Sequence, residues 1–227
     1  MKTIIGVIML IMMTTLSYAN DIYVTQSGNA LDLDITQDGE NNTVGNSTTA
    51  SASAGVTTIL NIDQIGDSNV ITYQIAGATY TGVINLVGNS NNVDLNCDST
   101  GGNSSCGTAN AVINFTGSSN DIDLDIGQTS SANTADVDIV GQSGSDSNVV
   151  AATVDGNSAV LTITVNGDTN NYLIDIDGNG DSVGHTLIHS HTGGIADVDI
   201  IQSGTNDNMI TLTTSGDNAD IDISQTD

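Results

Sequence analysis

The chain has almost no positive charge. Its 227 residues include 27 Asp and Glu but a single basic side chain, Lys2, and the formal net charge is −26. A chain so poor in Lys and Arg cannot neutralise phosphates, so binding of nucleic acid by the usual electrostatic route is excluded. Attraction to anionic lipid headgroups is excluded for the same reason, and we expect no membrane insertion.

Several other residue types are missing or rare. The sequence has no Pro, no Trp and one Phe, whereas it has 25 Gly. This is not the composition of an ordinary globular enzyme. The mean hydropathy of +0.01 is too high for a typical disordered chain, despite the charge.

The first residues have the features of an export signal. Lys2 precedes an apolar run over 3–13 that is too short to span a bilayer, and Ser17-Tyr18-Ala19 supplies the small residues of a cleavage site. We predict a signal peptide over 1–19 and a single repeat domain over 20–227. The mature protein is then secreted, extracellular or on the cell surface, and has no Lys or Arg.

The glycines recur at a nearly constant spacing. Eleven residues separate Gly66 from Gly77, Gly77 from Gly88, and Gly156 from Gly167. A repeated spacing of this kind is typical of a solenoid.

Between the glycines, apolar residues alternate with Asp. The pattern Ala-Asp-Val/Ile-Asp-Ile occurs at 135–139, 196–200 and 219–223. Period two places the aliphatic side chains on one face and Asp on the other, as in a half-buried strand. The sequence therefore predicts an all-β chain, folded as a flattened β-solenoid of two parallel sheets. It would have about seven rungs of ~22 residues, each strand-turn-strand, with loop insertions.

Gln and Asn fall on the same side of the predicted strands as the aliphatic residues. A lone buried amide is costly, but in a stack each amide can bond the identical side chain one rung away. We therefore expect two structural ladders. The Gln ladder would comprise Gln26, Gln64, Gln142 and Gln202, and the Asn ladder Asn69, Asn91, Asn120, Asn148, Asn170 and Asn208.

The recurring pattern Ile/Val-x-Gln-x-Gly-x-x-Asn resembles the curlin repeat of bacterial curli, the secreted amyloid fibres of biofilms. The segments 62–69 and 22–28 carry it best, and 200–208 is similar with one extra turn residue. The resemblance covers most of the predicted mature chain. It implies a fibre subunit whose partners are further copies of itself, an outer-membrane export pore and a nucleator, with a role in biofilm matrix or cell adhesion.

The predicted end strands carry no polar cap. Both 22–26 and 221–225 have the pattern of a good strand, and an uncapped strand edge is a template for another copy. Copies would then add head to tail. Stacked Asp residues ~4.8 Å apart repel by about 0.9 kcal/mol in water, so acid or divalent cations should promote assembly, with carboxyl pKa values raised by their neighbours.

Four stretches interrupt the repeat, at 45–55, 97–107, 129–134 and 180–194. The second holds the only two cysteines, Cys97 and Cys106. In an exported chain this favours a disulfide over a two-thiolate metal site, since no His lies near in sequence. The fourth holds His185, His189 and His191, which share one face if the segment is extended. They could bind Zn²⁺ or Cu²⁺; the alternative is a solvated loop.

Other chemistry finds little support in the sequence. The segment 175–181 matches the first half of an EF-hand loop, but Thr186 stands where a bidentate Glu is needed, so a plain turn is favoured. The solvated Asp ladders offer no apolar pocket that would tune a catalytic acid, and no nucleophile motif accompanies the histidines. We expect no enzyme activity and no required cofactor, with divalent cations as optional ligands.

Two alternatives to a fibre stay open. One is a monomeric ice-binding solenoid, for which outward Thr162, Thr164, Thr211 and Thr213 are candidates. The other is a monomeric calcium-stabilised adhesin.

Overall fold

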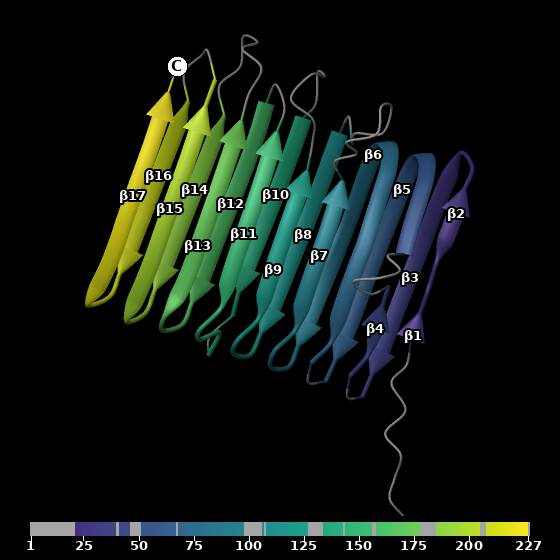
Figure 1. The fold of residues 1–227 in the computed structure, drawn as a ribbon, viewed down its shortest axis with the longest axis horizontal. Helices are drawn as coiled ribbons and strands as arrows, with labels where there is room; N and C mark the ends of the chain where they lie inside the picture. Colours follow the sequence, from purple (N-terminus) through teal and green to yellow (C-terminus); the bar gives the residue numbers. More distant parts are fainter. Residues whose placement is uncertain are drawn as a thin grey trace, which may run out of the picture.

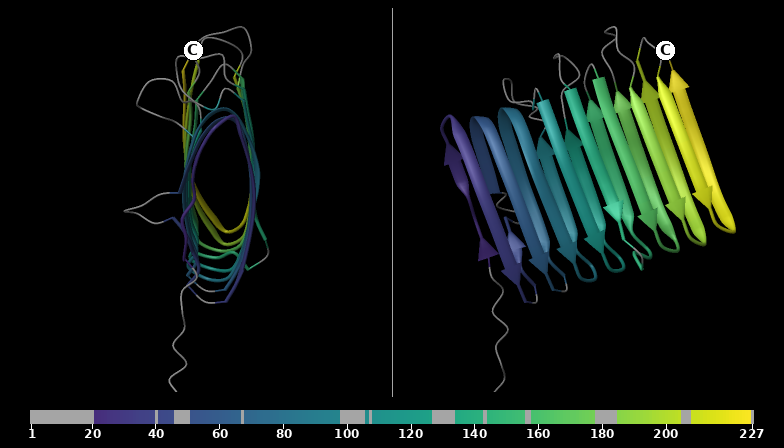
Figure 2. Two further views of the ribbon diagram at one scale, coloured as in Figure 1. Left: turned by 90° about the vertical axis from the view of Figure 1, so that its right-hand side faces the viewer. Right: turned by 180° about the vertical axis from the view of Figure 1, so that it is seen from behind.

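The computed structural model describes residues 21–39, 41–45, 51–66, 68–97, 106, 108–126, 134–142, 144–155, 158–177, 185–204 and 208–226. The predicted signal peptide and much of the four insertions lie outside the described residues. Within these ranges the chain forms strands and no helix, and it coils between two parallel sheets (Figure 1). Seen along its long axis the coil is a flattened closed loop (Figure 2).

The two sheets are built from alternate strands of the chain. β5 (Ser51–Ile65) and β6 (Val70–Val87) turn a corner and contribute to both. The first sheet contains the N-terminal parts of β5 and β6 with β1 (Asp21–Ile22), β2 (Thr25–Ser27), β4 (Thr43–Val44), β7 (Asn92–Cys97), β9 (Asp121–Ile126), β11 (Val149–Asp155), β13 (Asn170–Asp177), β15 (Ile195–Ser203) and β17 (Asn218–Thr226). The second contains their C-terminal parts with β3 (Ala30–Asp38), β8 (Thr108–Thr116), β10 (Thr134–Gly141), β12 (Ser158–Asn166), β14 (Thr186–Thr192) and β16 (Met209–Ser215).

Every strand pairs in parallel with the strand one turn earlier or later. Asn69 and Asn91 lie 22 residues apart on neighbouring turns, which is the predicted rung. Asn91 and Asn120 lie 29 apart, because the second insertion falls between them. The predicted β-solenoid of two parallel sheets is confirmed, and the expected number of about seven rungs is close to the number of strands stacked in each sheet.

Strict register aligns the inward side chains into columns. Ile122 pairs with Val93 below and Val150 above, and all three are fully buried. Their neighbours along the strand, such as Asp121 and Asp123, point outward. A slip of one residue would bury the aspartates and expose the aliphatics, so the alternation fixes the register.

The corners that lead from the second sheet to the first explain the recurring Gly-x-Ser-Asn. Gly117 has a φ of +121°, and a Cβ there would collide with the carbonyl oxygen of Gly88 one turn below. Ser119 then adopts the left-handed region with a φ of 61°, and Asn120 follows. Glycine is needed because only it tolerates both the dihedral and the close backbone stacking.

Candidate functional site

A column of asparagines runs along the corner described above. The side-chain nitrogen of Asn91 donates to the Gly88 carbonyl at 2.8 Å and to Oδ1 of Asn120 at 3.0 Å. The backbone nitrogen of Asn91 donates to the same Oδ1 at 3.0 Å. Backbone-to-Oδ1 bonds of this kind link Asn42, Asn69, Asn91, Asn120, Asn148 and Asn170 in turn.

The column differs from the predicted Asn ladder at its two ends. Asn42 belongs to it and was missed, although Gly39 three residues earlier carries the same corner signal. Asn208 does not belong, because it precedes a second-sheet strand, at the opposite corner. Its Oδ1 accepts a hydrogen bond from the backbone nitrogen of His185 at 3.1 Å.

The four predicted glutamines do not form one ladder. Gln64 donates to Oε1 of Gln37 at 2.6 Å, a partner that was not predicted. The next two positions in that column are Leu86 and Phe115, so the amide stack ends after one pair. Apolar side chains fill the interior there equally well, which is why the pattern does not require Gln on every rung.

The remaining glutamines lie elsewhere in the coil. Gln26 and Gln202 end first-sheet strands near opposite ends of the molecule. They donate to the backbone carbonyls of Ala30 at 3.1 Å and His185 at 3.2 Å, respectively. Gln142 is exposed just after β10. Gln26 and Gln202 therefore bond the backbone at a corner, whereas Gln142 faces solvent.

Cys97 and Cys106 are joined by a disulfide, with their Cα atoms 5.7 Å apart. Both side chains are buried. The backbone nitrogen of Cys106 also donates to the carbonyl of Cys97 at 3.3 Å. The bond closes the base of the second insertion and ties it to the rung.

The three histidines line the interior of the coil. His189 and His191 alternate inward on β14, and His185 precedes that strand; each is at most 3% exposed. Nδ1 of His185 accepts a hydrogen bond from the backbone nitrogen of Ala159 at 3.1 Å. The segment is extended with all three on one face, as the pattern predicted, but that face is buried. The solvated-loop alternative is wrong.

Tyr172 of β13 packs against two of these histidines. Its hydroxyl lies 2.9 Å from Nδ1 of His191, and its ring centroid lies 4.3 Å from that of His189. Burial, with a smaller contribution from His191, lowers the pKa of His189 to about 4. Burial also lowers the pKa of His191, whereas Asp168 acts to raise it. The neutral ring of His189 has no hydrogen-bond partner among the described residues.

The neutral imidazole of His189 could bind a metal ion, but its surroundings offer few further ligands. Across the described ranges, no three His, Cys, Asp or Glu side chains are grouped so as to hold a metal ion. The metal site stays a prediction. The turn of the EF-hand-like segment, 178–184, lies outside the described residues.

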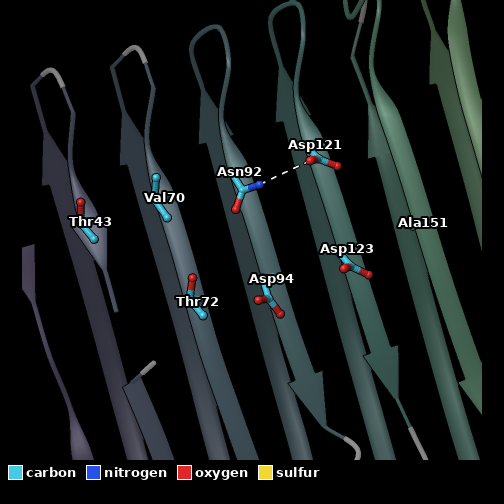
Figure 3. A pocket seen from close by; sticks show the side chains of 8 residues that line it. All are labelled: Thr43, Val70, Thr72, Asn92, Asp94, Asp121, Asp123 and Ala151. Atoms are coloured by element: carbon cyan, nitrogen blue, oxygen red, sulfur yellow. Dashed lines mark hydrogen bonds between the residues drawn. The ribbon is translucent and has the colours of Figure 1, made fainter. Parts of the chain in front are cut away.

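The first sheet presents carboxylates in register on its outer face. A hollow of about 470 Å³ there is lined by Thr43, Val70, Thr72, Asn92, Asp94, Asp121, Asp123 and Ala151 (Figure 3). Asn92 donates to a carboxylate oxygen of Asp121 at 3.5 Å. Asp94 and Asp123 occupy the same register on adjacent strands. Burial first, and then the charges of Asp94 and Asp121, raise the pKa of Asp123.

Near the C-terminal end, the outer face of the second sheet differs in charge from that of the first sheet. The outward positions of β12, β14 and β16 carry no charged side chain. They are Ser158, Val160, Thr162, Thr164, Asn166, Thr186, Ile188, Ser190, Thr192, Met209, Thr211, Thr213 and Ser215. On the opposite face of the same rungs, β15 and β17 present Asp197, Asp199, Asp220 and Asp222.

The C-terminal end of the coil is open. β16 and β17 pair with β14 and β15, and no described strand covers their other edges. Ile221 and Ile223 continue the interior columns of Val198 and Ile200, yet they are 37% and 48% exposed. On the last rung, a strand edge and a layer of apolar core side chains are therefore exposed to solvent.

The fold and its end define the class of protein: an open-ended β-solenoid of two parallel sheets. No protein-family model, no curated protein and no solved structure matches the chain. No described segment forms a long apolar helix that could cross a membrane. The resemblance to the curlin repeat therefore depends on the residues of this chain alone.

Proposed function

We propose that the protein is a secreted structural subunit of a curli-like extracellular amyloid fibre, serving biofilm matrix or surface adhesion. Copies polymerise head to tail through their terminal rungs. The observation that carries this proposal is the open last rung, where Ile221 and Ile223 face the interior direction but remain exposed. An unpaired edge backed by apolar side chains is a template for another strand.

Two further features support export and assembly. The predicted leader over 1–19 and the Cys97–Cys106 disulfide fit an oxidising, extracellular environment. An export pore and a nucleator are the partners that the curlin resemblance implies. The role is structural, so no catalytic group and no cofactor are needed.

Electron microscopy and fibre diffraction of the mature chain, starting at Asn20, test the proposal. We expect fibres with a ~4.7–4.8 Å reflection along the fibre axis. A rod that stays monomeric at high concentration would contradict the proposal.

Two isoleucines provide a matched pair of variants. Ile223 and Ile201 are 48% and 47% exposed on adjacent strands, but only Ile223 faces the interior column at the end. Ile223→Lys should place a charge in the joint and stop fibre growth, whereas Ile201→Lys on the outer face should still polymerise. Denaturation curves of both variants establish that each is folded.

A second function, ice binding, is favoured by the uncharged outward face of β12, β14 and β16. In parallel strands, outward residues repeat at about 4.8 Å across the sheet and about 6.6 Å along it, so the outward Thr hydroxyls and methyls lie on a regular lattice that Val160, Ile188 and Met209 interrupt. Such a lattice can order a layer of water. A thermal-hysteresis measurement decides: no hysteresis from the folded protein eliminates this candidate.

A further inference from the structure

The two ends of the coil lie in the same sheet. The chain passes from one sheet to the other at each corner, beginning with β1 and β2 and ending with β17, all in the first sheet. The coil therefore contains a whole number of turns plus one half. The next strand position beyond β17 belongs to the second sheet, on the open edge of β16.

We infer that successive copies join with a half-turn rotation about the long axis. The β1 and β2 strands of the incoming copy then pair with β16, and its β3 pairs with β17. This inference rests on the proposed function, because it describes the joint between copies. It uses the edges of β1, β2 and β3 that turn away from β4 and β5.

The unrotated alternative leaves a gap in the second sheet. If β1 and β2 paired with β17, the incoming β3 would lie two strand spacings from β16 instead of one. Backbone groups of both strands would then lack partners, although buried backbone groups are almost always paired. The rotated joint fills every strand position of both sheets.

The residues across the rotated joint of β17 and β3 match position by position. Segment 220–225 of β17 reads Asp-Ile-Asp-Ile-Ser-Gln, and segment 32–37 of β3 reads Asp-Leu-Asp-Ile-Thr-Gln. Inside the coil, Ile223 would cover Ile35. Gln225 would lie on Gln37, in the arrangement that Gln64 already makes with Gln37 at 2.6 Å.

The other half of the joint matches as well. Segment 210–215 of β16 reads Ile-Thr-Leu-Thr-Thr-Ser, and segment 22–27 across β1 and β2 reads Ile-Tyr-Val-Thr-Gln-Ser. Ile210 and Leu212, which are half-buried at the open end, would be covered by Ile22 and Val24. The aliphatic columns therefore continue without interruption from one copy to the next.

Cysteine pairs on the outer face distinguish the two joints. Ser224 of β17 would stand opposite Thr36 in the rotated joint and opposite Thr25 in the unrotated one. Neighbouring Cα atoms in a parallel pair are ~4.8 Å apart, within the range that a disulfide spans. In either double variant the two new cysteines lie at opposite ends of one chain, so a cross-link must join two copies.

The experiment compares Ser224→Cys/Thr36→Cys with Ser224→Cys/Thr25→Cys, each as the mature chain with the native disulfide intact. Fibres are grown, checked by electron microscopy, oxidised and separated on a non-reducing gel. We expect a ladder of covalent oligomers from the Thr36 variant and monomers from the Thr25 variant. Fibres that show the reverse, equal ladders, or no ladder from either variant would overturn the half-turn joint and leave the fibre function standing. Failure of the wild-type chain to form fibres would overturn both.

Discussion

Oδ1 of Asn120 accepts two hydrogen bonds from Asn91 on the neighbouring rung, one from its side chain and one from its backbone nitrogen, each at 3.0 Å. One side-chain oxygen thereby fastens the corner of one turn to the next. Both residues are 1% exposed, so water cannot replace either bond. The stability of the corner depends on the amide, beyond its contribution to packing.

Removing that amide should destabilise the coil. Asn120→Ala leaves the backbone nitrogen of Asn91 buried without its acceptor, and we expect a loss of about 2–3 kcal/mol in the free energy of unfolding. Asn110, exposed on the outer face of β8, provides the control: Asn110→Ala should change it by less than about 0.5 kcal/mol. Urea denaturation measures both. Equal losses in the two variants would show that the column adds nothing.

The Cys97–Cys106 disulfide should stabilise the coil modestly, because the loop that it closes is short. For residues nine apart in sequence, chain entropy predicts a contribution of about 2–3 kcal/mol. Adding reductant to the wild-type protein should lower its unfolding free energy by that amount. The double variant Cys97→Ala/Cys106→Ala should show no response to reductant. An unchanged wild-type denaturation curve after verified reduction would refute this prediction.

His189 should make the protein less stable in acid. Its pKa is lowered from 6.5 to about 4 by burial, so between these pH values the unfolded chain binds a proton that the folded chain does not. Above pH 6.5 His189 does not lower the free energy of unfolding. The loss grows as the pH falls from 6.5 to about 4 and reaches about 3 kcal/mol in total.

Replacing the histidine tests this pH dependence. His189→Leu should flatten the stability profile over this window, whereas Leu187→Met, at the neighbouring inward position, should keep the wild-type slope. Denaturation at a series of pH values gives the comparison. A slope that survives in His189→Leu would assign the effect to other groups.

The fold was predictable because its information is local and repeated. The alternation around Val137 and Val198 sets strand, face and register together, so every repeat supports the same answer. The Asn column was predictable for the same reason, since Gly and Asn recur three residues apart. The disulfide was predicted from the closeness of the two cysteines in a chain that we expected to be exported.

The remaining features depend on which turn of the coil each residue occupies. Gln26 and Gln64 fit the same repeat pattern but lie in different sheets. The insertion at 45–55 lies between them and changes the number of residues in that turn, so counting residues does not reveal the difference. The burial of the histidines was hidden because the segment 180–194 looked like a loop. Only the pairing of His189 with Ile163 and Leu212 shows that this histidine takes the place of an aliphatic residue in an interior column.

The register-paired carboxylates should oppose folding at neutral pH. The pKa of Asp123 is raised, so its charged form is disfavoured in the folded state, and this penalty disappears as the pH falls through the folded-state pKa. Asp123→Asn should therefore stabilise the protein at pH 7 in low salt, by up to about 1 kcal/mol. The gain should shrink in acid and at high salt.

Asp136→Asn is the matched control, because the register neighbours of Asp136 are Asn110 and Val160 and carry no charge. It should give little or no gain. Equal gains in the two variants would show that general acidity is responsible and that the register pairing with Asp94 is not.

Repulsion between carboxylates paired in register should also control assembly at the joint between copies. The outward Asp220 and Asp222 on β17 would meet Asp32 and Asp34 of the incoming β3, and each pair repels by about 0.9 kcal/mol at ~4.8 Å in water. Fibre growth should therefore be slow at pH 8 in low salt and faster with salt, with divalent cations or in mild acid at pH 5. At pH 5 His189 stays neutral in most folded molecules. Asp222→Asn should shorten the lag at pH 8, whereas Asp136→Asn, remote from the joint, should not. Equal lag times for the wild type at pH 8 in low salt and at pH 5 would refute electrostatic control of assembly.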